Sequence, residues 1–230
     1  MVDVDFILER ISQYQDSPPD PTIEILAKRE LATQLRRLNN MLCSTAAPAE
    51  QIRELSEILE ARASLLETGV PEPEVLDADV RVIAPEMADF WDRSPFAGLA
   101  NPISPPATFR FDLENKLVRG EVTFGKSMGG APGRVHGGLV AALLDEALGR
   151  ACMFAGTPAM TVEFTTRFLH ATPVETSLRV EARLDSIDGR KIRTSGAVYA
   201  GENAVVEADG LFIAVDTEKF RALFALMAES

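Results

Sequence analysis

Residues 135–152 read VHGGLVAALLDEALGRAC, and this stretch decides the fold. Leu139, Leu143 and Ala147 recur at helical spacing, and the opposite flank of the same helix is also apolar and mostly small. A helix that is apolar nearly all round is normally enclosed by other structure. We therefore predict one long, buried central helix.

The start of this helix is unusually bare. Gly137 and Gly138 carry no side chain that could shield the first backbone N–H groups. These groups have no partner inside the helix, and together with the helix dipole they favour an oxyanion or a phosphate. The sequence therefore predicts an anion-binding end.

Two neighbouring carboxylates lie in the middle of the helix. Glu146 precedes Arg150 by four residues, the spacing of an ordinary surface ion pair. Asp145 faces small apolar residues instead, where desolvation raises the pKa of a carboxyl group and suits it to acid or base chemistry. We predict that Asp145 is the functional acid.

The helix geometry separates these two features. Gly138 and Asp145 lie on nearly the same side of the helix but about 10 Å apart along its axis. A reacting carbonyl must lie about 3 Å from both its oxyanion donor and its base or nucleophile. One copy of the helix cannot easily supply both, whereas two copies related by a two-fold axis can.

The composition limits the classes of protein that are possible. The chain has 230 residues, of which 46% are hydrophobic, and a net charge of -12, so it has the make-up of a globular domain with an appendage. The negative charge argues against nucleic acid or an anionic membrane as a partner, although a local basic site can still bind phosphate. No targeting segment and no uninterrupted apolar span is present in the sequence given, which predicts a cytoplasmic protein.

The few cysteines and histidines argue against a disulfide framework and a zinc site. Cys43 and Cys152 fall in different predicted units. The chain has two histidines, His136 and His170, and no pair of cysteines at ligand spacing. We predict no metal and no cofactor.

Residues 1–75 are predicted to form a helical hairpin, an N-terminal extension of the main domain. Apolar residues repeat at three- and four-residue spacing along both of its arms. Their seam can pack on the main domain or on a second chain, and we favour such a stabilising or oligomerising extension over a dedicated binding module, because most leucine stripes of this kind serve packing. Residues 76–107 form a linker rich in proline that can cover a pocket, since its aromatic residues favour contact with the domain.

From residue 108 the apolar period changes from helical to two, so residues 108–230 are predicted to hold a sheet around the central helix. The predicted strands are 109–111, 118–124, 160–169, 177–187, 191–200 and 204–215, followed by a short closing helix over 217–227. Asp188-Gly189 is a strong signal for a tight hairpin. Consecutive hairpins beside one apolar helix predict an α+β fold with an antiparallel sheet wrapped around that helix.

Two motif matches are misleading. Residues 120–127 fit the phosphate-loop pattern, and residues 125–129 fit the serine nucleophile elbow. Both motifs require a helix immediately after the loop, and residues 128–133 read MGGAPG, which cannot start one. We therefore reject a nucleotide-binding loop and a serine hydrolase.

The motif His136-Gly137-Gly138, with an acid nine residues after the histidine and antiparallel strands after the helix, resembles the hotdog-fold acyl-CoA thioesterases. The resemblance is to the group that includes the phenylacetate-pathway thioesterase and the human thioesterase-superfamily acyl-CoA hydrolases, and it covers about residues 108–216. It implies a hotdog fold. It also implies hydrolysis of an acyl-CoA thioester, with CoA as part of the substrate, by a homodimer or a dimer of dimers.

The resemblance also implies roles for individual residues. The acid that matches Asp145 acts as general base or as nucleophile, and the N–H groups of Gly137 and Gly138 polarise the thioester carbonyl from the other subunit. The histidine that matches His136 fixes the turn or contacts this carbonyl. A hydroxyl that falls on Thr161 holds the water molecule.

Two further positions bear on the resemblance. Arg190-Lys191 matches a basic pair at the mouth of the CoA site in relatives, although exposed charges are commonplace in hairpin turns. Some relatives carry Asn or Gln about six residues before the histidine, where this chain has Gly130. We expect this difference to affect the rate and the geometry of the water molecule rather than the class of reaction.

Two other functions stay open at this stage. One is a hotdog protein that binds acyl-CoA without hydrolysing it, as a sensor or carrier; the isolated carboxyl of Asp145 favours the enzyme, because binding alone does not require it. The other is a hotdog dehydratase, which needs a histidine paired with an acid. His170 is the remaining candidate for that role, and it lies at the predicted end of a strand.

Overall fold

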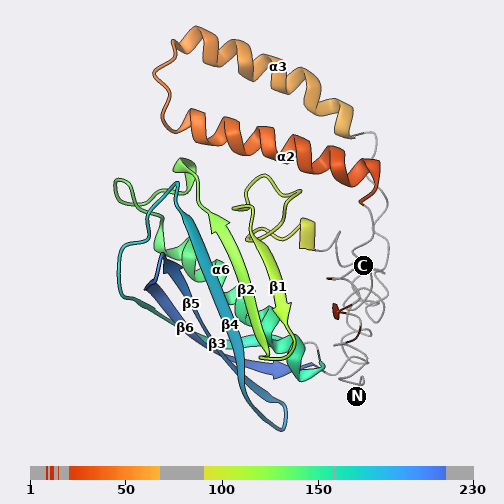
Figure 1. The fold of residues 1–230 in the computed structure, drawn as a ribbon. Coiled ribbons are helices and arrows are strands. Elements are labelled where there is room, and N and C mark those ends of the chain that lie inside the picture. The colour runs from red at the N-terminus through yellow and green to blue at the C-terminus, as the bar shows by residue number, and fades with distance from the viewer. Residues whose placement is uncertain are drawn as a thin grey trace.

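The computed structural model describes residues 9, 11, 12, 15, 21–67, 91–157 and 159–215. Six antiparallel strands form one sheet in the order β1-β2-β4-β5-β6-β3, and helix α6 (Gly137–Ala151) lies against one face of it (Figure 1). The strands are β1 (Thr108–Asp112), β2 (Leu117–Thr123), β3 (Ala159–Phe168), β4 (Ser177–Asp188), β5 (Lys191–Ala200) and β6 (Asn203–Ala214). This confirms the predicted α+β hotdog arrangement. The predicted helix over 217–227 lies outside the described residues.

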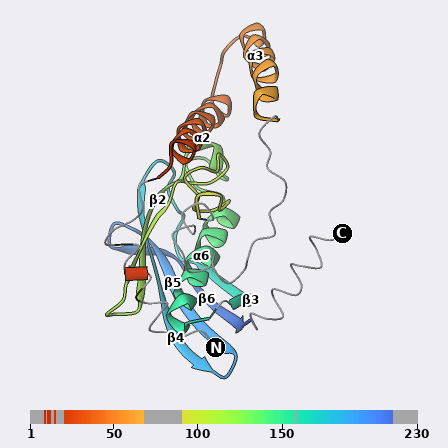
Figure 2. The same ribbon diagram turned by 90° about the vertical axis from the view of Figure 1, so that its right-hand side faces the viewer.

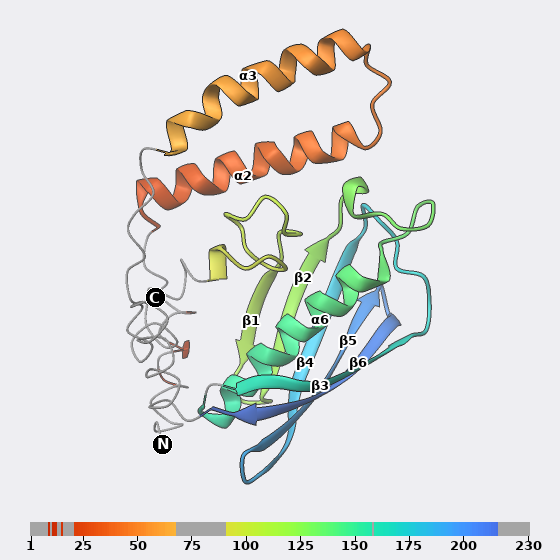
Figure 3. The same cartoon turned by 180° about the vertical axis from the view of Figure 1, so that it is seen from behind.

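Helix α6 is the centre of the hydrophobic core. Val140, Leu143, Leu144, Ala147 and Leu148 are fully buried against the sheet. The view from the helix side shows α6 lying across the strands (Figure 3). The flank of Asp145 and Glu146 is only half-buried, so one stripe of the helix stays open to a further contact.

Two glycines let the helix approach the sheet closely. A Cβ atom added to Gly196 in β5 would lie 3.0 Å from Leu148 Cδ2, and one added to Gly210 in β6 would lie 3.1 Å from Leu148 Cδ1. A Cβ atom would come still closer to the sheet itself, 2.5 Å from the Glu181 carbonyl oxygen at position 196 and 2.5 Å from the Phe212 ring at position 210. These glycines therefore leave room for Leu148 of the helix and for the neighbouring residues of the sheet.

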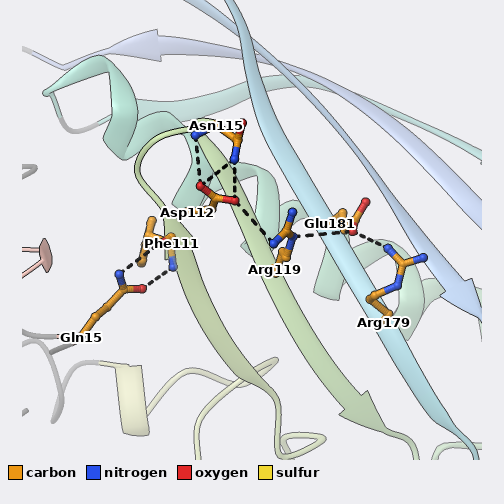
Figure 4. A network of polar contacts seen from close by, with 7 residues as sticks. All are labelled: Gln15, Phe111, Asp112, Asn115, Arg119, Arg179 and Glu181. Atoms are coloured by element: carbon orange, nitrogen blue, oxygen red, sulfur yellow. Dashed lines mark hydrogen bonds and ion pairs between the residues drawn. The ribbon is translucent and has the colours of Figure 1, made fainter.

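The two edges of the sheet differ. At the β1 edge, the side chain of Gln15 donates a hydrogen bond to the Phe111 carbonyl at 2.9 Å and accepts one from the Phe111 N–H (Figure 4). On the outer face nearby, Arg119 contacts Asp112 and Glu181, and Glu181 also pairs with Arg179 (Figure 4). The β1 edge is thus partly covered by the chain itself, whereas no other described residue pairs with the free edge of β3.

Helices α2 (Ile23–Leu42) and α3 (Ala49–Glu67) form the N-terminal hairpin. Polar contacts attach α2 to the main domain: Arg29 pairs with Asp92 at 2.7 Å, and Arg36 donates to the carbonyls of Leu99 and Asn101. Residues 49–66 of α3 are all exposed, and α3 lies farther from the sheet than α2 does (Figure 2). The apolar seam of α3 is therefore not covered by any described part of this chain.

The predicted surface ion pair of Glu146 and Arg150 is wrong in one respect, because Arg150 is buried. Its side chain is 5% exposed and donates to Glu146 at 2.8 Å. Its guanidinium lies 4.1 Å from the Trp91 ring centroid and 4.6 Å from that of Phe109. Trp91 and Phe109 lie far from Arg150 in the sequence, so helical spacing alone could not predict this burial. The packing of the Arg150 guanidinium against these two rings holds Trp91, at the start of the 91–107 segment, against α6.

Replacing Arg150 with methionine is expected to destabilise the fold by about 3 kcal/mol, because it leaves Glu146 without its buried partner and removes two cation–π contacts. Urea unfolding followed by the fluorescence of Trp91, the single tryptophan, measures this change. The matched control is Arg183→Met, since Arg183 is exposed and pairs with Asp185 on the surface. Arg183→Met is expected to lower the free energy of unfolding by at most about 1 kcal/mol. An equal loss of unfolding free energy in the two variants would contradict a structural role for the contacts of Arg150.

No helix among the described residues combines the length and the apolar composition needed to cross a membrane.

Candidate active site

Asp145 and Thr161 meet at the half-buried flank of α6. The Thr161 hydroxyl donates a hydrogen bond to Asp145 Oδ1 at 3.0 Å. The register of β3 against β6 shifts between Thr161 and Glu163, so Val162 is an extra residue in the strand. Bulges of this kind redirect side chains and are frequent beside active sites. The predicted acid and the predicted hydroxyl therefore lie in direct contact.

The surroundings of Asp145 alter its acidity. Burial raises the pKa of the Asp145 carboxyl above its ordinary value of 3.8. The hydrogen bond from Thr161 opposes this rise, and the nearby charge of Glu146 adds to it. A carboxyl whose pKa is raised toward neutrality accepts a proton more readily, which is what a general base requires.

The N-terminus of α6 is capped by His136. Its Nδ1 atom accepts a hydrogen bond from the Gly138 N–H at 3.1 Å. Because Nδ1 is the acceptor, a neutral imidazole carries its proton on Nε2, which can donate outward. The N–H of Gly137 makes no hydrogen bond to any residue that the structure describes. The two predicted oxyanion donors therefore differ, and Gly137 is the one left open.

Close packing explains the glycine at position 137. A Cβ atom there would lie 3.1 Å from Cε1 of Phe168, whose ring covers the start of the helix. Sequence reasoning missed Phe168, because an apolar residue at the end of a strand has no distinctive pattern. In the structure its side chain is 56% exposed, at the end of an edge strand. At Gly130 a Cβ atom would lie 3.1 Å from the His136 Cα, so the polar side chain that some relatives carry there would be tight in this chain.

The two groups that the sequence predicts to act on one substrate lie far apart within one chain. Gly137 and Asp145 are eight residues apart on one helix, a separation of about 12 Å along the axis. The free edge of β3 lies next to Asp145 through Thr161, and it exposes large apolar side chains: Met160, Val162 and Phe168 are 56–63% exposed. An exposed apolar edge strand is a template for pairing with another chain.

Arg190 and Lys191 lie at the β4–β5 turn, beside Gly189 with its φ of 58°. Arg190 donates two hydrogen bonds to the Ala214 carbonyl, at 3.2 and 3.1 Å. Lys191 pairs with Ile213 in β6, which in turn pairs with Met160 in β3, so the basic pair lies two strands, about 10 Å, from the β3 edge. The structure brings it to the same end of the sheet as Thr161 but not into contact with Asp145.

Other reactive groups are excluded by their surroundings. Burial, with a contribution from Asp145, raises the pKa of the Cys152 thiol to about 12, so this thiol stays neutral and is not a nucleophile. Ser127 belongs to a short 3-10 helix, η1 (Lys126–Met128), and its N–H and hydroxyl both donate to Asn40. Within the described ranges no three His, Cys, Asp or Glu residues gather in a way that could hold a metal ion.

Comparison with known proteins places the chain in a family. A family model described as "Thioesterase superfamily" matches residues 132–207. A crystal structure of a thioesterase superfamily protein is 30% identical, with a TM-score of 0.68, over 86% of this chain and 97% of that one.

Curated relatives match over a shorter stretch. Acyl-coenzyme A thioesterase THEM4 of Bos taurus is 35% identical over 97 residues, which are 41% of this chain and 40% of that protein. Acyl-coenzyme A thioesterase THEM5 of Homo sapiens is 29% identical over 97 residues, 41% of this chain and 39% of that one. The match with this chain thus spans about two fifths of the length of these relatives.

Proposed function

Because the chain belongs to the thioesterase superfamily, we propose that it hydrolyses an acyl-CoA thioester to a free acid and CoA. The observation that carries this proposal is the half-buried Asp145 carboxyl, with its raised pKa, held by the Thr161 hydroxyl at 3.0 Å. The names of the THEM4 and THEM5 relatives support the choice of acyl-CoA as substrate.

In the proposed reaction Asp145 is the general base. It takes a proton from a water molecule as the water oxygen bonds to the thioester carbon, and the Thr161 hydroxyl helps to orient the acid. The carbonyl oxygen becomes an oxyanion. When this tetrahedral species collapses, the carbon–sulfur bond breaks and the leaving sulfur takes the proton back from Asp145. In the alternative route the Asp145 carboxylate attacks the thioester carbon directly as a nucleophile. Incorporation of oxygen from isotopically labelled water into the Asp145 carboxyl would distinguish this route from general-base catalysis.

The open N–H of Gly137 is the proposed oxyanion donor, supported by the outward Nε2–H of His136. Since Asp145 of the same chain is about 12 Å away along the helix, the donor and the base act on one substrate only if they come from two chains. Antiparallel pairing of two β3 edges would produce that arrangement. We therefore propose a homodimer with two active sites at its interface.

The proposed compartment is the cytoplasm. Both cysteines in the described residues are free thiols, which supports a reducing environment.

Release of free thiol from a panel of acyl-CoAs of different length and branching tests the proposal. We expect turnover of at least one acyl class by the purified protein. The competing function is binding of acyl-CoA without hydrolysis, and the outcome that favours it is saturable binding of acyl-CoA, measured calorimetrically, with no thiol release from any member of the panel.

A further inference from the structure

The last turn of α2 contacts the loop that leads into α6. The Asn40 side chain accepts two hydrogen bonds from Ser127 in η1, one from its backbone N–H and one from its hydroxyl, both at 2.9 Å. Gly125 lies directly against this carboxamide, since a Cβ atom added there would collide with it. The glycine and the serine that resemble a nucleophile elbow in the sequence therefore receive the side chain of Asn40.

A backbone hydrogen bond joins η1 to the start of α6. The Met128 carbonyl accepts from the His136 N–H at 2.9 Å. His136 in turn holds the first turn of the helix, because its carbonyl accepts from the Leu139 N–H at 3.0 Å and its Nδ1 accepts from the Gly138 N–H. The peptide unit between His136 and Gly137 contains the open N–H, so the position of η1 affects the proposed oxyanion donor directly.

The loop between η1 and α6 has little stiffness of its own. Residues 129–133 read GGAPG, and glycine leaves the backbone free to take several conformations. After this stretch, the Val135 N–H donates to the Thr172 carbonyl at 2.9 Å. At η1 the described side-chain contacts include an ion pair of Lys126 with Glu175 at 3.7 Å, but both side chains are more than half exposed and such pairs contribute little. The two hydrogen bonds from η1 to α2 are therefore its main polar support among the described residues.

Helix α2 is fixed to the main domain at a second place, where it lies across the 91–107 segment (Figure 1). Arg29 pairs there with the buried Asp92 at 2.7 Å. Asp92 follows Trp91, whose ring lies against Arg150 near the C-terminus of α6. Helix α2 thus reaches from the segment that packs on one end of α6 to the loop that holds the other end, which gives Asn40 a rigid support.

We propose that Asn40 is a positioning residue for hydrolysis. Its carboxamide holds η1, and the hydrogen bond between Met128 and His136 transmits this support to the peptide that carries the Gly137 N–H. The inference rests on the proposed function, because it takes Gly137 as the oxyanion donor. It gives the N-terminal extension a part in the reaction, through the loop and without contact between Asn40 and the reacting atoms.

Asn40→Leu tests this role, because leucine has a similar branched shape but accepts no hydrogen bond. We expect kcat to fall about tenfold with KM little changed, since a displaced oxyanion donor weakens binding of the transition state rather than of the substrate. Asn40→Asp keeps the acceptor oxygens and should retain most of the wild-type kcat. The matched control is Asn39→Leu, which changes the exposed neighbouring asparagine and should leave kcat unaltered.

Gly125→Ala reaches the same contact from the opposite side. The backbone of Gly125, with φ of -76° and ψ of 172°, suits alanine, so the fold should accept the change. The added methyl group takes the place of the Asn40 carboxamide and should displace it from Ser127. We expect a loss of kcat similar to that of Asn40→Leu, and little further loss when the two changes are combined.

Combining Asn40→Leu with Gly137→Pro separates positioning from a general loss of stability. If Asn40 acts through the Gly137 N–H, deletion of that N–H should leave Asn40→Leu with little further effect on kcat. Losses that multiply in the double variant would overturn the proposal. An unaltered kcat in Asn40→Leu, or an equal loss in Asn40→Asp, would overturn it as well.

Hydrogen exchange examines the structural part without catalysis. In Asn40→Leu the backbone amides of Ser127 and His136 should exchange about tenfold faster than in wild type, as expected for the loss of an ordinary hydrogen bond, while the amides of β5 keep their rates. Unchanged exchange at these two amides would contradict the proposal. If wild type hydrolyses no thioester, the proposed function fails, and exchange at the two amides still decides whether Asn40 holds the start of α6.

Discussion

Replacing Asp145 with asparagine is expected to lower kcat for thioester hydrolysis by about 100-fold to 10,000-fold, the range that a positioned general base contributes. The amide has the shape of the acid and can still contact Thr161, so the fold should persist. Glu146→Gln is the matched control, because it neutralises the adjacent carboxylate, and it should change kcat by less than about tenfold. Comparable losses in the two variants would contradict the assignment of Asp145.

The same variant should change the dependence of stability on pH. Since burial raises the pKa of Asp145 in the folded state, the folded protein holds this proton more tightly than the unfolded chain does. Stability from this group is fully present below 3.8, the ordinary aspartate value, and is lost as the pH rises toward the raised value. Asp145→Asn removes this loss, so its urea midpoint should exceed that of wild type at neutral pH. The difference should shrink on going to acid.

Replacing Gly137 with proline should lower kcat by about 100-fold to 1,000-fold, because it deletes the open N–H that we assign to the oxyanion. Proline is tolerated at the first position of a helix, and His136 already has the extended backbone, with ψ of 126°, that a residue before proline prefers. The exposed Phe168 ring must move slightly to accept the new side chain. Circular dichroism and the kcat of the variant are the measurements.

Mixing this variant with Asp145→Asn tests whether the site joins two chains. A heterodimer would have one intact site, with its N–H from one chain and its carboxylate from the other, and one site lacking both. After random exchange, half of the dimers are mixed, so activity should return to about a quarter of the wild-type value. Folded heterodimers that show no recovery would rule out a site shared between chains.

The elements closest together in the sequence could be predicted best. The α6 helix, the antiparallel strands and the turn at Asp188-Gly189 follow from apolar periodicity and turn residues, and the structure contains all of them. Helical spacing placed Asp145 among small apolar residues, but it predicted an enclosed helix and not the half-buried flank that the structure has. The order of strands could not be predicted, because β3 pairs with β6 across 38 to 55 residues, and local periodicity carries no information about such a contact.

Contacts that depend on several distant segments were also beyond the sequence. The burial of Arg150 depends on Trp91 and Phe109. The choice of Thr161 came from the family resemblance, since an exposed threonine in a strand has no distinctive pattern.

The difference between the two edges of the sheet limits how many copies of the chain can join through it. Gln15 binds the backbone N–H and carbonyl of Phe111 at the β1 edge, which leaves the β3 edge open to another copy. Two copies that pair through β3 would cover the β3 edge of each copy, so this edge would no longer be open to a third copy. In the proposed homodimer the sheet would therefore end after two copies rather than extend into a fibre.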